Sequence, residues 1–164
     1  MPLALMNLNF QRRDLFRAWL MATVFSGLPS TLHALATGGD PLEATRAAGA
    51  MLVPADSELV VLVTAAGIAH AAVSAFWVGI FGLLLPRWRV TAWAVAGAAA
   101  VAVLDLGLIA PLFFPPIAAL AFWPQFADHL MWGLLLGATL RYFGGPSGER
   151  GSGKKPAPTA WPPV

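Results

Sequence analysis

The residues that could do chemistry in this chain lie inside segments that are otherwise apolar. Ionisable groups inside a membrane cost about 2.5–3.5 kcal/mol each on insertion scales, so they usually face a cavity or one another. We therefore expect a polar pocket in which Asp105 holds a histidine by a hydrogen bond, while imidazoles relay protons or hold a ligand or metal. The candidate site residues are the three histidines, two aspartates and one serine: His33, His70, Ser74, Asp105, Asp128 and His129.

Each candidate also has a purely structural explanation. His33 lies one turn from the end of its apolar run, where an interfacial histidine bonds to water or a backbone carbonyl. Asp128 lies near the start of its run, where the helix dipole favours an acid. His129 points about 100° away from Asp128, so the two do not form one ligand set. Alternatively, a buried pair of Asp105 with His70 or a serine only stabilises helix packing, through a hydrogen bond between helices worth about 0.6–2 kcal/mol.

The cofactor is left open, and no catalytic residue is assigned. The chain has no Cys, which excludes disulfides, thiolate metal sites and cysteine nucleophiles. Phosphate-binding loops, GxSxG elbows and HExxH motifs are also missing from the sequence. Haem would need two imidazoles at similar depth, and His70 with His33 or His129 matches poorly. A divalent metal would draw on two histidines and two aspartates without HxxxH or ExxH spacing, namely His33, Asp105, Asp128 and His129.

The composition of the chain is typical of an integral membrane protein. Its 164 residues are 58% hydrophobic and 11% charged, and the mean hydropathy is +0.70. That is too apolar for an ordinary water-soluble domain. The sequence pI is about 9.7, but the basic residues flank the apolar runs and form no stripe with aromatics. We therefore expect a lipid bilayer as the partner and no nucleic acid.

The elements that must position these residues are predicted to be helices. The fold class is all-α: a four-helix transmembrane bundle with a short outward-side amphipathic helix between spans 1 and 2, from Asp40 to about Leu52. A hydrocarbon layer of about 30 Å needs about 20 apolar residues per helix. We predict a leader at 1–14, a membrane domain at 15–143 and a disordered tail at 144–164. The four predicted spans within the membrane domain are 15–37, 58–85, 90–110 and 124–142.

The first predicted span has two unusual features. Arg12 and Arg13 before an apolar run, with small residues near its end, also sketch a cleavable twin-arginine signal. A retained span is favoured because the run is long and carries a polar row at helical spacing: Thr23, Ser26, Ser30, His33 and Thr37. Pro29 should kink this helix near Phe25, where Ser26 or Ser30 can satisfy a freed carbonyl.

Small residues form rows at helical spacing on the later spans. The rows are Gly67, Ala71, Ala75 and Gly79; Ala94, Ala98 and Ala102; and Gly133 and Gly137. Such rows let helices approach closely, either within one chain or against a membrane-protein partner or a second copy. Residues 111–123, PLFFPPIAALAFW, are apolar and rich in proline, and are interpreted as an interfacial loop that offers a further contact.

Basic residues predict the orientation. Nine of the ten Lys and Arg residues fall on one side of the four-span arrangement, and only Arg46 falls on the other. Because basic residues collect on the cytoplasmic side, both termini should be cytoplasmic. The membrane is then the bacterial cytoplasmic (inner) membrane, crossed several times, and the candidate pocket opens outward.

Three stretches resemble a family of small four-span bacterial membrane proteins without an established activity. They read FSGLPSTLHALATGGDPLEATRAAG, GIAHAAVSAFWVGIFGLLLPR and PQFADHLMWGLLLGATLR, and the resemblance covers most of Phe25 to Arg141. It implies membership and a four-span fold, and adds no mechanism. Such proteins often have a basic stretch before the last span, where this chain has the apolar residues 111–123.

These observations favour a protein without enzymatic chemistry whose outward-facing His/Asp pocket binds a small ligand, an ion or a proton. The alternative is an accessory or assembly subunit of a larger membrane complex, joined through the small-residue rows and residues 111–123. An enzyme that depends on a metal or haem is the third hypothesis.

Overall fold

The computed structural model describes residues 10–144, which form helices and no β-strand. In chain order the elements are α1 (Arg12–Phe25), α2 (Leu28–Thr37), α3 (Glu43–Gly49), α4 (Leu59–Leu84), α5 (Val90–Leu104), the π-helical turn η1 (Asp105–Ile109), α6 (Ala110–Phe113), α7 (Pro115–Ala118) and α8 (Phe122–Phe143). The all-α prediction is confirmed. Most of the predicted leader, up to residue 9, and the predicted tail from residue 145 lie outside the described residues.

The four-span prediction is supported only in part. Within residues 10–144, two helices are long and apolar enough to cross a membrane: Leu59–Leu84 and the continuous stretch Val90–Phe113, each with a hydropathy of 2.1. The first predicted span is instead two helices of 14 and 10 residues. The last has 22 residues but includes Asp128, His129 and Arg141, which lower its hydropathy. The coarser statement is therefore an all-helical chain with two helices able to span a membrane.

The first predicted span divides at Ser26 and Gly27, close to the predicted kink. Pro29 has no backbone N–H to donate one turn back, which interrupts the helical pattern. The next N–H, that of Ser30, donates to Asp128 Oδ1 on α8 at 2.9 Å. The Ser30 hydroxyl donates to the Gly27 carbonyl at 3.2 Å, as expected of a serine beside a helix break. A complete break thus replaces the predicted kink because α8 provides an acceptor for the new helix start.

Small residues bring α5 and α8 into close contact. A Cβ atom on Gly137 would lie 2.5 Å from the Thr91 Cα, and one on Gly133 would lie 2.6 Å from the Ala98 Cβ. Ala94 and Ala98 are buried on the facing side of α5. These two rows therefore form the chain's own core. Of the two kinds of contact expected for Gly133 and Gly137, the structure shows the one within the chain.

The row on α4 behaves differently. Gly67, Ala75 and Gly79 are exposed, and no other group lies within 4 Å of a Cβ placed on Gly67 or Gly79. Only Ala71 is half-buried, where its carbonyl accepts a hydrogen bond from Trp19 Nε1 of α1 at 3.1 Å. This row is the packing edge that the described residues leave uncovered.

The connecting segments are more helical than the sequence indicated. The predicted loop 111–123 is corrected: Val90–Phe113 continues through Pro111, α7 begins at Pro115, and α8 begins at Phe122. Pro115 fits its position because the first turn of a helix needs no backbone donor, and Pro111 stands two residues after the π-helical turn η1. The short helix predicted between the first two spans starts at Glu43 and not at Asp40, whose carboxylate accepts the N–H of Leu42 at 2.8 Å in the preceding turn.

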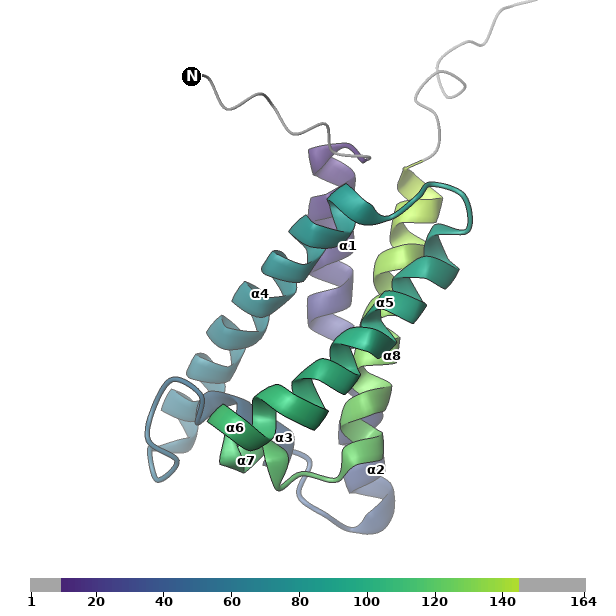
Figure 1. Cartoon of the computed structure of the whole chain (residues 1–164). Helices are drawn as coiled ribbons and strands as arrows, with labels where there is room; N and C mark the ends of the chain where they lie inside the picture. Colours follow the sequence, from purple (N-terminus) through teal and green to yellow (C-terminus); the bar gives the residue numbers. More distant parts are fainter. Residues whose placement is uncertain (1–9, 145–164) are drawn as a thin grey trace, which may run out of the picture.

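The helices run alternately up and down the bundle (Figure 1). The start of α1, the end of α8 and the connection from α4 to α5 lie at one end, and α2, α3, α6 and α7 gather at the other. Gly49 of α3 is so close to the Leu62 carbonyl on α4 that a side chain there would meet backbone. Because α3 and α1 contact α4 while α8 contacts α5, the site lies between these two sets of helices, beside α3.

Candidate functional site

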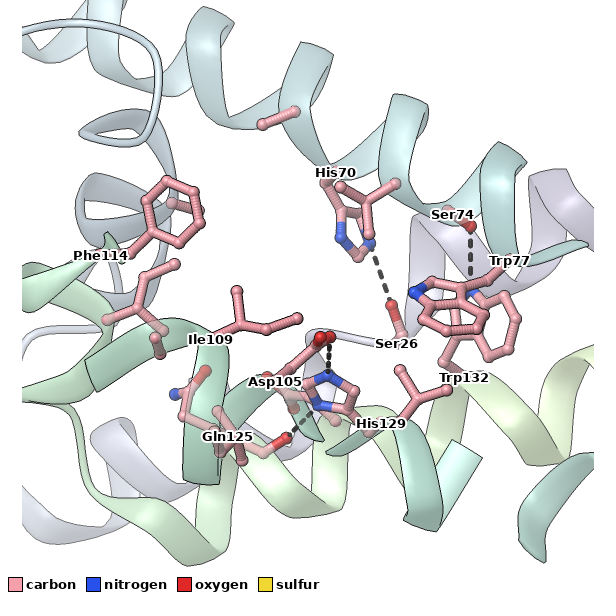
Figure 2. A pocket seen from close by; sticks show the side chains of 18 of the residues that line it. Ser26, His70, Ser74, Trp77, Asp105, Ile109, Phe114, Gln125, His129 and Trp132 are labelled. Atoms are coloured by element: carbon pink, nitrogen blue, oxygen red, sulfur yellow. Dashed lines mark hydrogen bonds and ion pairs between the residues drawn. The ribbon is translucent and has the colours of Figure 1, made fainter. Parts of the chain in front are cut away.

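A cavity of about 490 Å³ lies between α4 on one side and α5, η1 and α8 on the other. The cavity is lined by five of the six predicted site residues: His70, Ser74, Asp105, Asp128 and His129. Figure 2 shows His70 on α4 facing Asp105 and His129 across this space. The sixth residue, His33, is exposed on α2 and lines a separate cavity of about 120 Å³. The structure thus brings five of the predicted residues together and leaves His33 outside.

Asp105 and His129 form the hydrogen bond expected between this carboxyl and a histidine. His129 Nε2 lies 3.3 Å from Asp105 Oδ2, and His129 Nδ1 lies 2.9 Å from the Gln125 carbonyl (Figure 2). A carbonyl only accepts, so Nδ1 carries a hydrogen. The hydrogen between Nε2 and Oδ2 then belongs either to an imidazolium or to a carboxylic acid. In both assignments the Asp105–His129 pair holds one shared proton and is neutral overall.

A local change of helix type positions Asp105. It is the first residue of η1, whose wider turn is closed by a hydrogen bond from the Ala110 N–H to the Asp105 carbonyl, five residues apart. Single π-helical turns of this kind are frequent at functional sites. Asp105 is half-buried at the point where α5 changes into η1, and its carboxyl reaches His129 on α8.

His70 is held at one nitrogen and open at the other. Its Nε2 lies 3.1 Å from the Thr23 carbonyl and 3.1 Å from the Ser26 hydroxyl, both contributed by the first predicted span. Because the carbonyl needs a donor, Nε2 carries the hydrogen and Nδ1 is left as an acceptor. Figure 2 shows this second ring nitrogen turned away from Ser26 and toward the cavity. The break after Phe25 matters here, since Ser26 ends α1 beside His70.

Ser74 is a buried junction between three helices. Its hydroxyl oxygen accepts hydrogen bonds from Thr23 Oγ1 of α1 at 2.7 Å and from Trp132 Nε1 of α8 at 2.8 Å. Only 3% of Ser74 is exposed. Two donors on one oxygen fill its acceptor capacity, so Ser74 joins helices beneath the cavity and has no lone pair left for a ligand.

Asp128 lies on α8, but its carboxylate caps the start of a different helix, α2. Its Oδ1 accepts the N–H of Ser30, which stands in the first turn of α2. A carboxylate there pairs with the positive end of that helix dipole. The structural explanation expected Asp128 in the first turn of its own helix, but α8 begins at Phe122 and the cap acts on α2. The side chain faces the cavity and holds the two helices together.

Several functional residues were missed by the sequence interpretation. Ser26, Gln125 and Trp132 line the cavity and bond to predicted site residues. A signal for Ser26 and Thr23 was present, because both belong to the polar row of the first span. Gln125 shares a helical face with His129. Trp132 carried no signal, since tryptophan is common in membrane helices for other reasons.

The described residues do not form either of the two cofactor sites considered, one for a divalent metal ion and one for haem. Within residues 10–144 no group of three or more His, Asp and Glu side chains is placed to hold a metal ion. His33 lies in the other cavity, and Asp128 is engaged by Ser30. For haem, His129 has both ring nitrogens bonded within the chain, so pairing it with His70 would require breaking one of those bonds.

Similarity to known proteins adds nothing to this site. Comparisons of the chain with protein-family models, curated proteins and solved structures found no match. The chemistry on offer is a shared proton at Asp105 and His129, a free imidazole nitrogen at His70, and apolar walls around both.

Proposed function

We propose that this chain is a small multi-pass protein of the bacterial cytoplasmic membrane whose outward-facing pocket binds a small ligand, an ion or a proton without catalysing a reaction. One observation carries the proposal: His70, Asp105 and His129, from three separate helical segments, converge on a single cavity in a predominantly apolar bundle. Ionisable side chains at such depth are costly and mark ligand or proton pathways.

The four-span arrangement is part of the proposal. The first membrane crossing consists of α1 and α2, the second of α4, the third of the stretch from α5 to α6, and the fourth of α8. The break within the first crossing is compatible with a membrane because Asp128 and the Gly27 carbonyl bond with Ser30 and satisfy the backbone there. Arg12, Arg87 and Arg141 belong to the end of the bundle that we assign to the cytoplasm, in agreement with the preference of basic residues for that side.

Single cysteines test the topology cleanly, because the natural chain has none. Ala55→Cys precedes α4 on the proposed outer side, and Trp88→Cys lies in the turn between α4 and α5 on the proposed cytoplasmic side. A membrane-impermeant maleimide added to intact cells should label position 55 and reach position 88 only after permeabilisation. Labelling at both positions in intact cells contradicts this topology.

The pocket is tested by identifying the small molecules that stay bound to the protein during extraction from the membrane. The chain is extracted from native membranes into nanodiscs, and co-extracted small molecules are identified by mass spectrometry. Wild type and His33→Ala should retain the same molecule, whereas His70→Ala and Asp105→Asn should retain at least about fivefold less of it, the effect of about 1 kcal/mol. Equal retention by all four proteins, each folded by circular dichroism, contradicts a pocket at His70 and Asp105.

The accessory-subunit alternative is favoured by the uncovered row on α4. Gly67, Ala75 and Gly79 leave open space along one helix, the arrangement that lets a second membrane helix approach closely. Under this alternative the chain migrates as part of a larger assembly in mild detergent. Gly67→Leu then releases it as a free subunit, while co-extraction of a small ligand is unaffected.

A further inference from the structure

The cavity is amphipathic. Its polar groups, among them His70, Asp105 and His129, stand beside hydrocarbon walls from α4, η1 and the α6–α7 region, namely Val73, Phe76, Leu106, Ile109 and Phe114. A volume of about 490 Å³ falls in the range of cavities that hold small organic ligands. A bare ion or proton needs no such apolar space, so the cavity fits a molecule with a small polar head and a hydrocarbon body.

The opening of the cavity lies on the outside of the bundle. Phe76 and Val73 line the cavity and are also 61% and 43% exposed, so its rim reaches the surface beside α4. The helices α4 and α5 pack on α1 and α8 and share no comparable interface with each other. In the proposed four-span arrangement this surface meets lipid, and a ligand with a hydrocarbon body can enter sideways from the membrane.

The charges around the cavity favour a neutral head group. Neither Lys nor Arg lines it among residues 10–144, so an anion would meet two carboxyl groups without a counter-ion. The Asp105 charge is already balanced by the proton shared with His129, and Asp128 is held by the Ser30 N–H at the start of α2. An ammonium head would therefore lose its hydration and would find Asp105 already paired with His129 and one oxygen of Asp128 already bonded to Ser30.

The unused hydrogen-bonding atoms are acceptors. His70 Nδ1 has no hydrogen-bond partner among the described residues, because Nε2 carries the hydrogen for Thr23. Asp105 bonds to His129 through Oδ2, which leaves Oδ1 without a partner in residues 10–144. Both acceptors belong to residues that line the cavity, so a head group that donates hydrogen bonds is favoured over one that only accepts.

We infer that the cavity binds a neutral lipid whose head group donates a hydroxyl hydrogen to His70 Nδ1 or Asp105 Oδ1, with its hydrocarbon lying between α4 and η1. Isoprenoid alcohols and quinols share this chemistry. The inference rests on the proposed function, because it names the class of ligand for the same pocket.

Three probes that differ only at the head group test the hydroxyl. Purified full-length protein in nanodiscs is titrated with radiolabelled farnesol, farnesyl methyl ether and farnesoic acid, and empty nanodiscs are subtracted. Farnesol should bind saturably at one site, and the ether and the acid at least about fivefold more weakly, the effect of one neutral hydrogen bond. An ether that binds as tightly as the alcohol, or an acid that binds more tightly, overturns the inference.

Variants place the binding in the cavity. Of His70→Ala and Asp105→Ala, the variant that removes the acceptor should weaken farnesol binding about fivefold and leave the ether unchanged, whereas the matched variant His33→Ala should change neither. Farnesol binding that is unchanged in both variants overturns the inference. Leu106→Trp fills the apolar part and should abolish binding of all three probes while the polar groups remain. Farnesol binding that survives Leu106→Trp in a folded protein contradicts the inferred location.

A second pair of probes separates the two sources of the hydroxyl. Decylubiquinol donates hydroxyl hydrogens and decylubiquinone does not, so a quinol site prefers the reduced form and binds it more tightly than farnesol. Failure of every probe, together with a different molecule retained through His70 and Asp105, overturns this inference and leaves the proposed function intact. Failure of every probe with nothing retained overturns both.

Discussion

The two ends of the α5–α8 pair are built differently on the same helix faces. Toward the chain termini, Gly133 and Gly137 of α8 meet Ala94 and Ala98 of α5 with no room for a further carbon atom. One turn beyond Gly133 on the same face of α8 stands His129, and beyond Ala98 on α5 stands Asp105. Where small residues give way to polar ones, backbone contact is replaced by a side-chain hydrogen bond and a cavity.

This contrast separates two tasks along one helix pair. The closed end fixes the positions of the helices, because glycine and alanine allow backbone to touch backbone. The open end then holds Asp105 and His129 at hydrogen-bonding distance without being needed for close packing. Changes at the closed end should therefore affect stability, and changes at the open end should affect binding.

The largest effect is expected where Gly137 touches α5. A Cβ there would lie 2.5 Å from the Thr91 Cα, which is backbone and cannot turn aside. Gly137→Leu should lower the free energy of unfolding by about 3 kcal/mol or more, at the upper end of overpacking effects. Unfolding by SDS in mixed micelles, followed by circular dichroism, measures the change.

The same substitution on the uncovered face is the control for this prediction. Gly67→Leu meets nothing within 4 Å, so its stability should stay within about 0.5 kcal/mol of the wild type. Equal destabilisation by Gly137→Leu and Gly67→Leu would show that the close contact with Thr91 does not govern the response, and the distinction between the two faces would fail.

An intermediate effect is expected at the junction beneath the cavity. Ser74→Ala removes the acceptor shared by Thr23 and Trp132 and leaves both donors buried, which should cost about 1–2 kcal/mol. Thr64→Ala on the same helix is the matched control, because its hydroxyl bonds only to the local Val60 carbonyl. The indole fluorescence of Trp132 should also respond to Ser74→Ala. Equal stabilities of the two variants would mean that Ser74 does not join the helices.

The smallest effect is expected at the cap between α8 and α2. Asp128→Ala removes the acceptor for the Ser30 N–H and should cost about 1 kcal/mol, the usual value of a helix cap. Asp128→Asn keeps an oxygen at the same place and should cost only a few tenths of that. Hydrogen exchange at Ser30 measures the cap directly, and it should accelerate in Asp128→Ala. Unchanged exchange at Ser30 would show that the hydrogen bond from Asp128 of α8 does not protect the start of α2.

The sequence by itself determined the helical class, the apolar stretches and the depth at which ionisable groups occur along them. These properties are local, since hydropathy, helical spacing and proline positions act over a few residues. The break after Phe25 was predictable for that reason, as was the suitability of Gly133 and Gly137 for close contact. The proline-rich residues 111–123 misled the interpretation, because Pro115 falls in the first turn of α7, where a helix tolerates proline, and Pro111 directly follows the π-helical turn and Ala110.

Only the tertiary structure decided which groups meet. Sequence spacing places His33, His70 and His129 on their own helices, but the rotation of one helix against another selects His129 as the partner of Asp105. The same rotation makes Ser74 a junction and leaves His33 outside the cavity. Those angles are set by long-range packing of glycine and alanine between α5 and α8, and packing between segments far apart in the chain leaves no local mark in the sequence.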